Sequence, residues 1–204
     1  MLEIVNSKLN NFSENNNTIT VKEAEKMGIK RHTLSSLCKK GILERIKQGI
    51  YQKSDTITDE FLKIQKNNNI IFSNATALYF HNLTDRVPNI ITITVPQGYN
   101  VSHITKKFGN LKIYYVKKEI FEIGKIETLS KMSNKIYIYD KERTICDIIK
   151  NKNKIDIDVF SKALKLFFKN ENIKLRNLIK YSKELKIEKK VREYLEVLLW
   201  HQKS

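Results

Sequence analysis

The sequence predicts an α+β protein built from two domains. The first, residues 1–66, is expected to be a winged helix-turn-helix domain, because residues 20–53 follow the pattern helix, turn, helix and hairpin. The second, residues 67–204, is expected to hold a small, mainly antiparallel sheet followed by C-terminal helices, because strand-like alternation gives way to helical periodicity. The polar run Lys66–Asn69 marks the expected boundary.

Two short helices are predicted near the start of the first domain. Thr20 is expected to cap the first of them, and Glu23 follows at the spacing of a capping box. Gly28 suits the left-handed position just beyond the end of this helix. The second helix is expected to run from Lys30 to Lys40 and to stop at Gly41.

The second helix has one apolar and one polar face. Leu34, Leu37 and Cys38 recur at helical spacing and form the face expected to be buried. The next segment, Ile42–Lys53, is β-prone and is interrupted by a turn. Gly49 is expected at a positive-φ position in that turn, so the segment predicts a hairpin.

The polar face of the second helix predicts binding to double-stranded DNA. A helix fits the major groove, where short polar side chains near its start reach base edges. The candidate DNA-binding residues of this helix begin with Lys30. The candidates for base-edge or nearby phosphate contacts are Arg31, His32, Thr33, Ser35 and Ser36. The candidates for holding the phosphate backbone and the adjacent groove are Lys39, Lys40, Arg45, Lys47 and Gln48.

The density of positive charge in this region supports the same prediction. Residues 18–53 contain nine Lys or Arg and three Glu, the densest positive charge in the chain. The alternative is that this unit neutralises a protein partner by direct contact, since winged-helix units also serve as protein-interaction modules. A basic polar face is also often only a solvated face, and His32 can be such a solvent-exposed residue.

Composition favours an anionic partner and a cytoplasmic location. The 204 residues carry a formal net charge of +16, although only six of the 38 basic residues are Arg. Abundant Lys, Asn and Ile indicate an AT-rich genome, so part of this charge is compositional. Cys38 and Cys146 are expected to be reduced and buried. The N-terminus lacks the features of a signal peptide, and no apolar run approaches the roughly 20 residues that span a bilayer.

The remaining elements follow from periodicity. A helix is expected at residues 1–12, another at residues 59–66, and one follows Ser73. The expected strands are residues 91–95, 111–115 and 135–139, with a fourth between residues 120 and 128. Few helices separate these strands, which favours antiparallel pairing. Further helices are expected from Asp140, around Phe160 and from Ile187; their Lys-rich outer faces are either solvated or in contact with phosphates.

An enzymatic function is the weaker alternative. Its candidate site is a set of carboxylates that suits Mg²⁺-dependent phosphodiester cleavage: Asp140, Glu142, Asp147, Asp156 and Asp158. These acids lie at predicted helix starts, however, where they stabilise the helix dipole. The four histidines are scattered, and no phosphate-binding glycine loop is present. We therefore expect no catalytic activity, no metal and no cofactor.

Four stretches resemble the AbiEi-type antitoxins, the antitoxin half of bacterial abortive-infection toxin–antitoxin pairs. The first combines the capped helix and polar second helix with the run GILERIKQGIYQK. The others are SNATALYFHNLTDRVP at residues 73–88, TVPQGYN at residues 94–100 and DKERTICDIIK at residues 140–150. They occur in the order typical of the family and span most of residues 18–150. The last helices match only in general character.

The family resemblance implies functional properties that the residues by themselves do not. It implies a type IV system of phage defence, in which the antitoxin represses its own operon by binding inverted repeats cooperatively. It also implies that a nucleotidyltransferase-like toxin is antagonised without a stable complex, with help from the C-terminal domain. We therefore expect a chain that is monomeric in solution and binds cooperatively on DNA.

Overall fold

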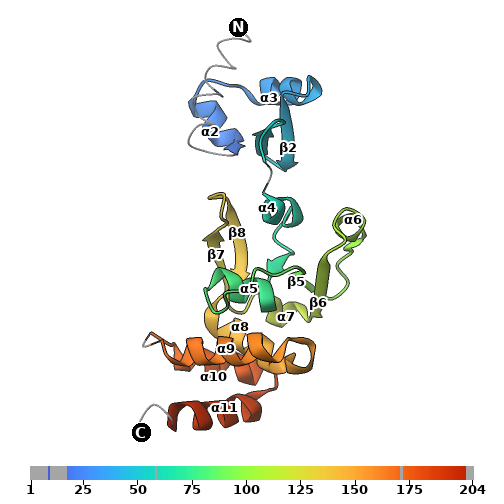
Figure 1. The fold of residues 1–204 in the computed structure, drawn as a ribbon. Helices are drawn as coiled ribbons and strands as arrows, with labels where there is room; N and C mark the ends of the chain where they lie inside the picture. Colours follow the sequence, from blue (N-terminus) through green and yellow to red (C-terminus); the bar gives the residue numbers. More distant parts are fainter. Residues whose placement is uncertain (1–8, 10–17, 58, 171, 201–204) are drawn as a thin grey trace. The chain divides into compact units, whose positions relative to one another are not determined.

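The computed structural model describes residues 9, 18–57, 59–170 and 172–200 of the chain, which form two compact units (Figure 1). The first unit contains the described residues up to Asn68 together with Thr128–Ile136. The second contains Asn69–Glu127 and the described residues from Tyr137 onward. The helix expected at residues 1–12 lies outside the described residues except for Leu9, which is buried.

Within residues 18–57, 59–68 and 128–136, the first unit contains three short helices and a small sheet. Its elements are β1 (Ile19–Thr20), α2 (Val21–Lys26), α3 (Arg31–Lys39), β2 (Leu43–Lys47), β3 (Ile50–Lys53) and α4 (Glu60–Ile64). The three strands pair antiparallel in the order β1-β3-β2. The order of two helices and a hairpin is therefore the one that the sequence predicts.

Capping interactions and one glycine turn hold α2 against α3. The Thr20 hydroxyl accepts a hydrogen bond from the Glu23 amide at 3.2 Å, and the Glu23 carboxylate accepts one from the Thr20 amide at 2.7 Å. The predicted capping box is thus confirmed. Gly28 has a φ of +77°, and the next residue, Ile29, is buried. The left-handed residue reverses the chain, so α3 begins immediately afterwards.

A buried carboxylate, Asp59, links α4 to the turn between residues 130 and 134. Asp59 caps α4 by accepting hydrogen bonds from the amides of Phe61 and Leu62. Its second oxygen accepts hydrogen bonds from the Ser130 hydroxyl and, at 2.9 Å, from the Asn134 amide group. Because buried polar groups need partners, this network fixes the turn within the first unit.

The second unit combines a five-stranded sheet with a bundle of helices. Its first elements are β4 (Ile71–Phe72), α5 (Asn74–Phe80), β5 (Ile91–Pro96), α6 (Ser102–Thr105), β6 (Leu111–Val116) and α7 (Lys118–Phe121). Then follow β7 (Lys125–Leu129), β8 (Lys135–Tyr139), α8 (Lys141–Lys150), α9 (Ile157–Phe168), α10 (Leu175–Glu184) and α11 (Glu188–Trp200). None of the helices in the described residues is long and apolar enough to cross a bilayer.

The five strands lie in the order β6-β5-β4-β8-β7. Strands β4 and β5 pair antiparallel, although the sequence predicted no strand at β4, whereas β5–β6 and β4–β8 are parallel. The predicted α+β class and the C-terminal helices are confirmed, with a sheet of mixed pairing. The parallel pairing arises because residues 97–110, which include the short helix α6, carry the chain back between β5 and β6.

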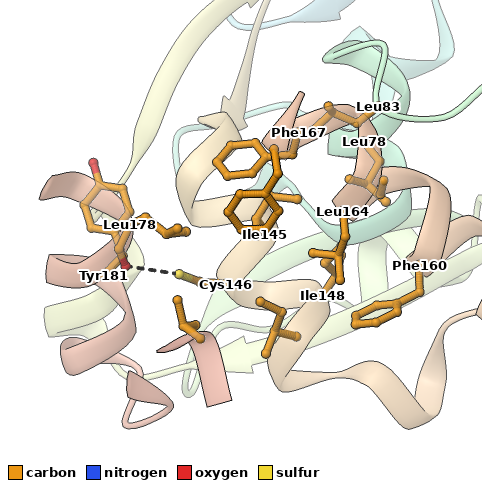
Figure 2. Close-up of a cluster of buried hydrophobic side chains, with 14 of the residues drawn as sticks. Leu78, Leu83, Ile145, Cys146, Ile148, Phe160, Leu164, Phe167, Leu178 and Tyr181 are labelled. Carbon is orange, nitrogen blue, oxygen red and sulfur yellow. Dashed lines mark hydrogen bonds between the residues drawn. The ribbon is translucent and has the colours of Figure 1, made fainter. Parts of the chain in front are cut away.

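The main hydrophobic core lies among α5, α8, α9 and α10. Figure 2 shows its central side chains: Leu78, Leu83, Ile145, Cys146, Ile148, Phe160, Leu164, Phe167, Leu178 and Tyr181. The Cys146 thiol donates a hydrogen bond to the carbonyl of Leu178 at 3.6 Å. Burial raises the pKa of this thiol far above its ordinary value, so the sulfur behaves as a small apolar group. Cys146 is buried as predicted, whereas Cys38, also expected to be buried, is only half-buried.

Arg143 of α8 is the largest fully buried side chain in the described residues. Its guanidinium pairs with Asp147 at 3.2 Å and donates to the carbonyls of Ile120 and Ile123 at 2.8 and 3.0 Å. Gly124 lies against the same side chain with a φ of +77°. A Cβ atom at Gly124 would approach the Arg143 Cβ to 2.6 Å, so only glycine fits this turn.

We predict that Asp59→Ala destabilises the protein by about 2 kcal/mol or more. The substitution removes a helix N-cap, which costs about 1 kcal/mol, and leaves buried donors without partners, which costs about 1–3 kcal/mol. Urea unfolding of the full chain measures the change. Asp55→Ala is the matched control, because Asp55 is exposed and should change the free energy of unfolding by less than about 0.5 kcal/mol. Equal effects of both substitutions would contradict the role given to Asp59.

Gly124→Ala is predicted to destabilise the protein by about 2–4 kcal/mol, from the left-handed backbone together with the clash against Arg143. Two control substitutions separate these causes in the same unfolding experiment. Gly98→Ala tests the backbone cost alone, because Gly98 has a φ of +81° but open space around it. Gly109→Ala is the baseline, because Gly109 has neither a left-handed φ nor a close neighbour. If Gly124→Ala costs no more than Gly98→Ala, the close contact with Arg143 is not a constraint.

Candidate nucleic-acid interface

Helix α3 buries one face and exposes the other. Leu34 and Leu37 are fully buried in the core of the first unit. His32, Ser36 and Lys39 lie on the opposite side of the helix and are exposed. Because the buried leucines set the rotation of the helix, the polar face has to point toward solvent.

The side chains at the start of α3 differ in how accessible they are. Arg31 is exposed, and Lys30, which is also exposed, occupies the N-cap position. Thr33 is half-buried, so it presents less surface than its neighbours. The Ser35 hydroxyl donates a long hydrogen bond of 3.4 Å to the carbonyl of Arg31 and therefore has a partner in the helix itself. The start of α3 thus offers two cations and a polar surface.

The hairpin formed by β2 and β3 places its basic side chains in two locations. The exposed Arg45 pairs with Tyr51 across the strands, next to a bulge. Lys47 and Gln48 lie at the hairpin turn, which is fixed to the start of α2 because the Val21 amide donates to the Gly49 carbonyl at 3.0 Å. The turn therefore has a defined position on the unit.

Arg45 also lies close to α3. Burial raises the pKa of the Cys38 thiol, and the nearby positive charge of Arg45 opposes this shift. Strand β2, which carries Arg45, packs against α3. Lys39 and Lys40 are exposed at the same end of the helix as Cys38. Three of the predicted DNA contacts are thus gathered at one end of α3.

The cations of α3 are not neutralised by the carboxylates around them. Within the described residues, Arg31, Lys39 and Lys40 form no ion pair with an acidic side chain. Two of the three acids in residues 18–53 have other partners: Glu23 completes the capping box, and Glu44 pairs with Lys63 of α4 at 3.5 Å. The positive potential of α3 therefore remains available to an anionic ligand.

One cation that the sequence assigned to the second domain belongs to the first unit. Lys131 is exposed in the turn that Ser130 and Asn134 fix to Asp59, and it therefore belongs to the first unit. The Asn134 carbonyl oxygen also accepts a hydrogen bond from the Thr18 hydroxyl at 2.6 Å. No local pattern predicts these contacts, because the partners are more than 70 residues apart in sequence.

The carboxylates considered for a nuclease site have separate structural roles. Asp140 caps α8 and also accepts a hydrogen bond from the Tyr181 hydroxyl at 3.0 Å. Glu142 accepts a hydrogen bond from the Lys174 amide at 2.9 Å, and Asp147 pairs with Arg143. Asp156 and Asp158 pair with Arg86, and Asp156 also caps α9. No three His, Cys, Asp or Glu side chains in the described part of the chain gather as a metal site requires.

His81 has a structural role. Its Nε2 atom lies 2.7 Å from the carbonyl oxygen of Tyr139, with which it shares a hydrogen bond. Burial lowers the pKa of this imidazole, so the neutral form is favoured, and its ring N–H donates to the carbonyl.

Comparison with known proteins gives a family model and solved structures of similar fold. The family model described as "Transcriptional regulator, AbiEi antitoxin" matches residues 8–52. The solved structure of the RV2827C protein from Mycobacterium tuberculosis is similar in fold, with a TM-score of 0.54 and 11% identity over 88% of this chain and 71% of that chain. No curated protein matches the chain.

The matched residues contain α2, α3 and nearly all of the β2–β3 hairpin, which are the elements that form the polar and basic surface described above. They coincide with the first of the four stretches that suggested the family. The match at residues 8–52 therefore confirms the resemblance to AbiEi antitoxin transcriptional regulators that the sequence motifs indicated.

Proposed function

We propose that this chain is a sequence-specific DNA-binding repressor and the antitoxin of a type IV abortive-infection system. In this proposal the first unit is a winged helix-turn-helix domain that binds inverted repeats upstream of its own operon. Occupation of the promoter then blocks RNA polymerase. The observation that carries the proposal is the solvent-facing side of α3, whose cations Arg31, Lys39 and Lys40 have no acidic partners among the described residues.

The shape of α3 suits the major groove. Its exposed N-terminal side chains, Arg31, His32 and Ser36, would contact base edges or nearby phosphates. Lys39, Lys40 and Arg45, at the other end of the helix, would hold the phosphate backbone and fix the register. Lys47 and Gln48 would reach the adjacent groove from the hairpin turn.

Antagonism of a toxin is the second part of the proposal. Its support is the family match, which belongs to antitoxin regulators, together with the motifs outside the matched residues. The expected functional partner is a nucleotidyltransferase-like protein that forms no stable complex with this chain. A direct protein–protein neutralisation would instead yield a soluble complex and a DNA affinity that depends little on salt.

A gel-shift titration tests the repressor function. The full chain is titrated against DNA from upstream of its own gene, with unrelated competitor DNA present, at two salt concentrations. Repression predicts a specific shift in one or two steps, and the step pattern reports cooperativity. Binding no tighter than binding to the competitor would overturn the proposal, and co-purification with the product of the neighbouring gene would then support direct neutralisation.

Arg31→Ala is predicted to weaken specific binding by about 1–3 kcal/mol, because it removes a side chain placed to contact a base or a nearby phosphate. Arg176→Ala is the matched control: Arg176 is exposed and also lacks an acidic partner among the described residues, but it lies on α10. We expect this control to bind like the unmodified chain. The placement of α3 in the groove is wrong if Arg31→Ala and Lys39→Ala both leave specific binding unchanged.

The salt dependence of binding is predicted to identify Lys39 as a phosphate contact. The logarithm of affinity should fall by about 0.9 per neutralised phosphate for each unit of log salt concentration. Lys39→Ala should reduce this slope by about 1 and weaken binding to specific and unrelated DNA alike. Fluorescence anisotropy at four or more salt concentrations measures the slope. An unchanged slope would remove Lys39 from the set of phosphate contacts.

A further inference from the structure

The second unit contains a cavity of about 260 Å³ that the proposed DNA-binding function does not use. It lies among the start of α5, the loop before β5, strand β6 and the segment leading into α9. Most of its exposed surface is apolar. The aliphatic lining residues are Ala75, Pro88, Ile90, Ile155 and Val159. Concave, largely apolar surfaces of this kind are typical of small-molecule sites.

The two buried polar residues that line the cavity already have partners. The Asn74 amide group donates to the Ser73 hydroxyl at 3.2 Å, and its carbonyl oxygen accepts from Asn151 at 3.2 Å. The Thr92 hydroxyl donates to the Ser73 carbonyl and accepts from the Thr76 amide at 3.0 Å. These groups are therefore satisfied without a ligand, and the floor of the cavity favours an apolar ligand surface.

Two lysines supply positive charge to the same cavity. The ammonium groups of Lys112 and Lys154 lie over the ring of Tyr114, at 5.7 and 6.0 Å from its centre. Lys112 also donates to the backbone carbonyl of Lys154 at 2.9 Å, which fixes it beside the cavity. Neither lysine pairs with a carboxylate within the described residues.

The acidic residue at the cavity does not cancel this charge. Asp156 accepts hydrogen bonds from the amides of Asp158 and Val159, and its carboxylate lies 3.4 Å from the guanidinium of Arg86. These hydrogen bonds hold the pKa of Asp156 below its usual range, so it stays charged and engaged with its partners. The lysines are thus the groups that remain to bind a charged ligand.

We propose that this cavity binds a small ligand with an apolar body and a single anionic group, of the class of hydrophobic carboxylates. The apolar body fills the space between α5 and the start of α9. The carboxylate meets Lys112 and Lys154. The site is independent of the α3 surface, so its occupancy can be tested without DNA.

The test is a titration of the full, isotopically labelled chain with benzoate, followed by two-dimensional amide NMR. Benzyl alcohol, which has a similar body and no charge, is the matched probe. Benzoate is expected to cause saturable shifts at the amides that line the cavity, Ala75, Ile90 and Tyr114 among them. It should bind about fivefold more tightly than benzyl alcohol, which is the upper end of the gain expected from one partly exposed ion pair.

Three variants separate the contributions of the lysines and of the apolar cavity to ligand binding. Replacing both lysines (Lys112→Gln with Lys154→Gln) should weaken the binding of benzoate by about fivefold and leave the affinity for benzyl alcohol unchanged. Val159→Trp should abolish the binding of both probes by filling the cavity, while the remaining amide spectrum shows that the fold is retained. Lys106→Gln, a change at an exposed lysine of the α6 region outside the cavity, should have no effect.

Three results would overturn the proposal. The first is the absence of saturable shifts with benzoate at millimolar concentration. The second is equal affinity for benzoate and benzyl alcohol, which would leave an apolar cavity without anion recognition. The third is that the shifts occur away from the lining residues or survive in the Val159→Trp chain.

Discussion

The burial of one guanidinium organises the second unit. Removing a charge from water is costly unless a counter-ion and hydrogen bonds replace the solvent. Arg143 obtains both, from Asp147 and from the carbonyls of Ile120 in α7 and Ile123 just after it. Those carbonyls fix the approach of α7 and the residues after it to α8, and the close approach in turn requires glycine at position 124. Helix α8 packs against α5, α9, α10 and α11, so the constraint on Arg143 extends to the whole bundle.

A comparable constraint acts on the first unit. The buried carboxylate of Asp59 is satisfied only when the turn containing Ser130 and Asn134 lies against α4. The turn thereby becomes part of the unit that carries α3, and the chain crosses between the two units three times. The rotation of α3 depends on a simpler rule. With Leu34 and Leu37 buried, His32, Ser36 and Lys39 on the opposite side of the helix are exposed.

The features that could be predicted from the sequence are those that residues close together in the chain determine. The capping box at Thr20, the left-handed Gly28 and the two faces of α3 each depend on residues within one or two turns of each other, and all three occur in the structure. The parallel pairing of β5 with β6 depends on a crossover whose short helix, α6, leaves little periodic signal. The candidate site was predictable as a surface, but the partial burial of Thr33 was not, because it depends on packing.

Arginine distribution separates functional charge from compositional charge. Many lysines of this chain reflect an AT-rich genome, so their number says little about an interface. Of the six arginines, three pair with carboxylates: Arg86, Arg143 and Arg192. Two of the remaining three, Arg31 and Arg45, lie on α3 and on the adjacent strand β2. Arginine is the residue best suited to bind phosphates and base edges, and a guanidinium that meets no carboxylate in the fold is available to an external anion. This distribution supports the proposal that α3 and its hairpin bind DNA, and it does so independently of the total charge.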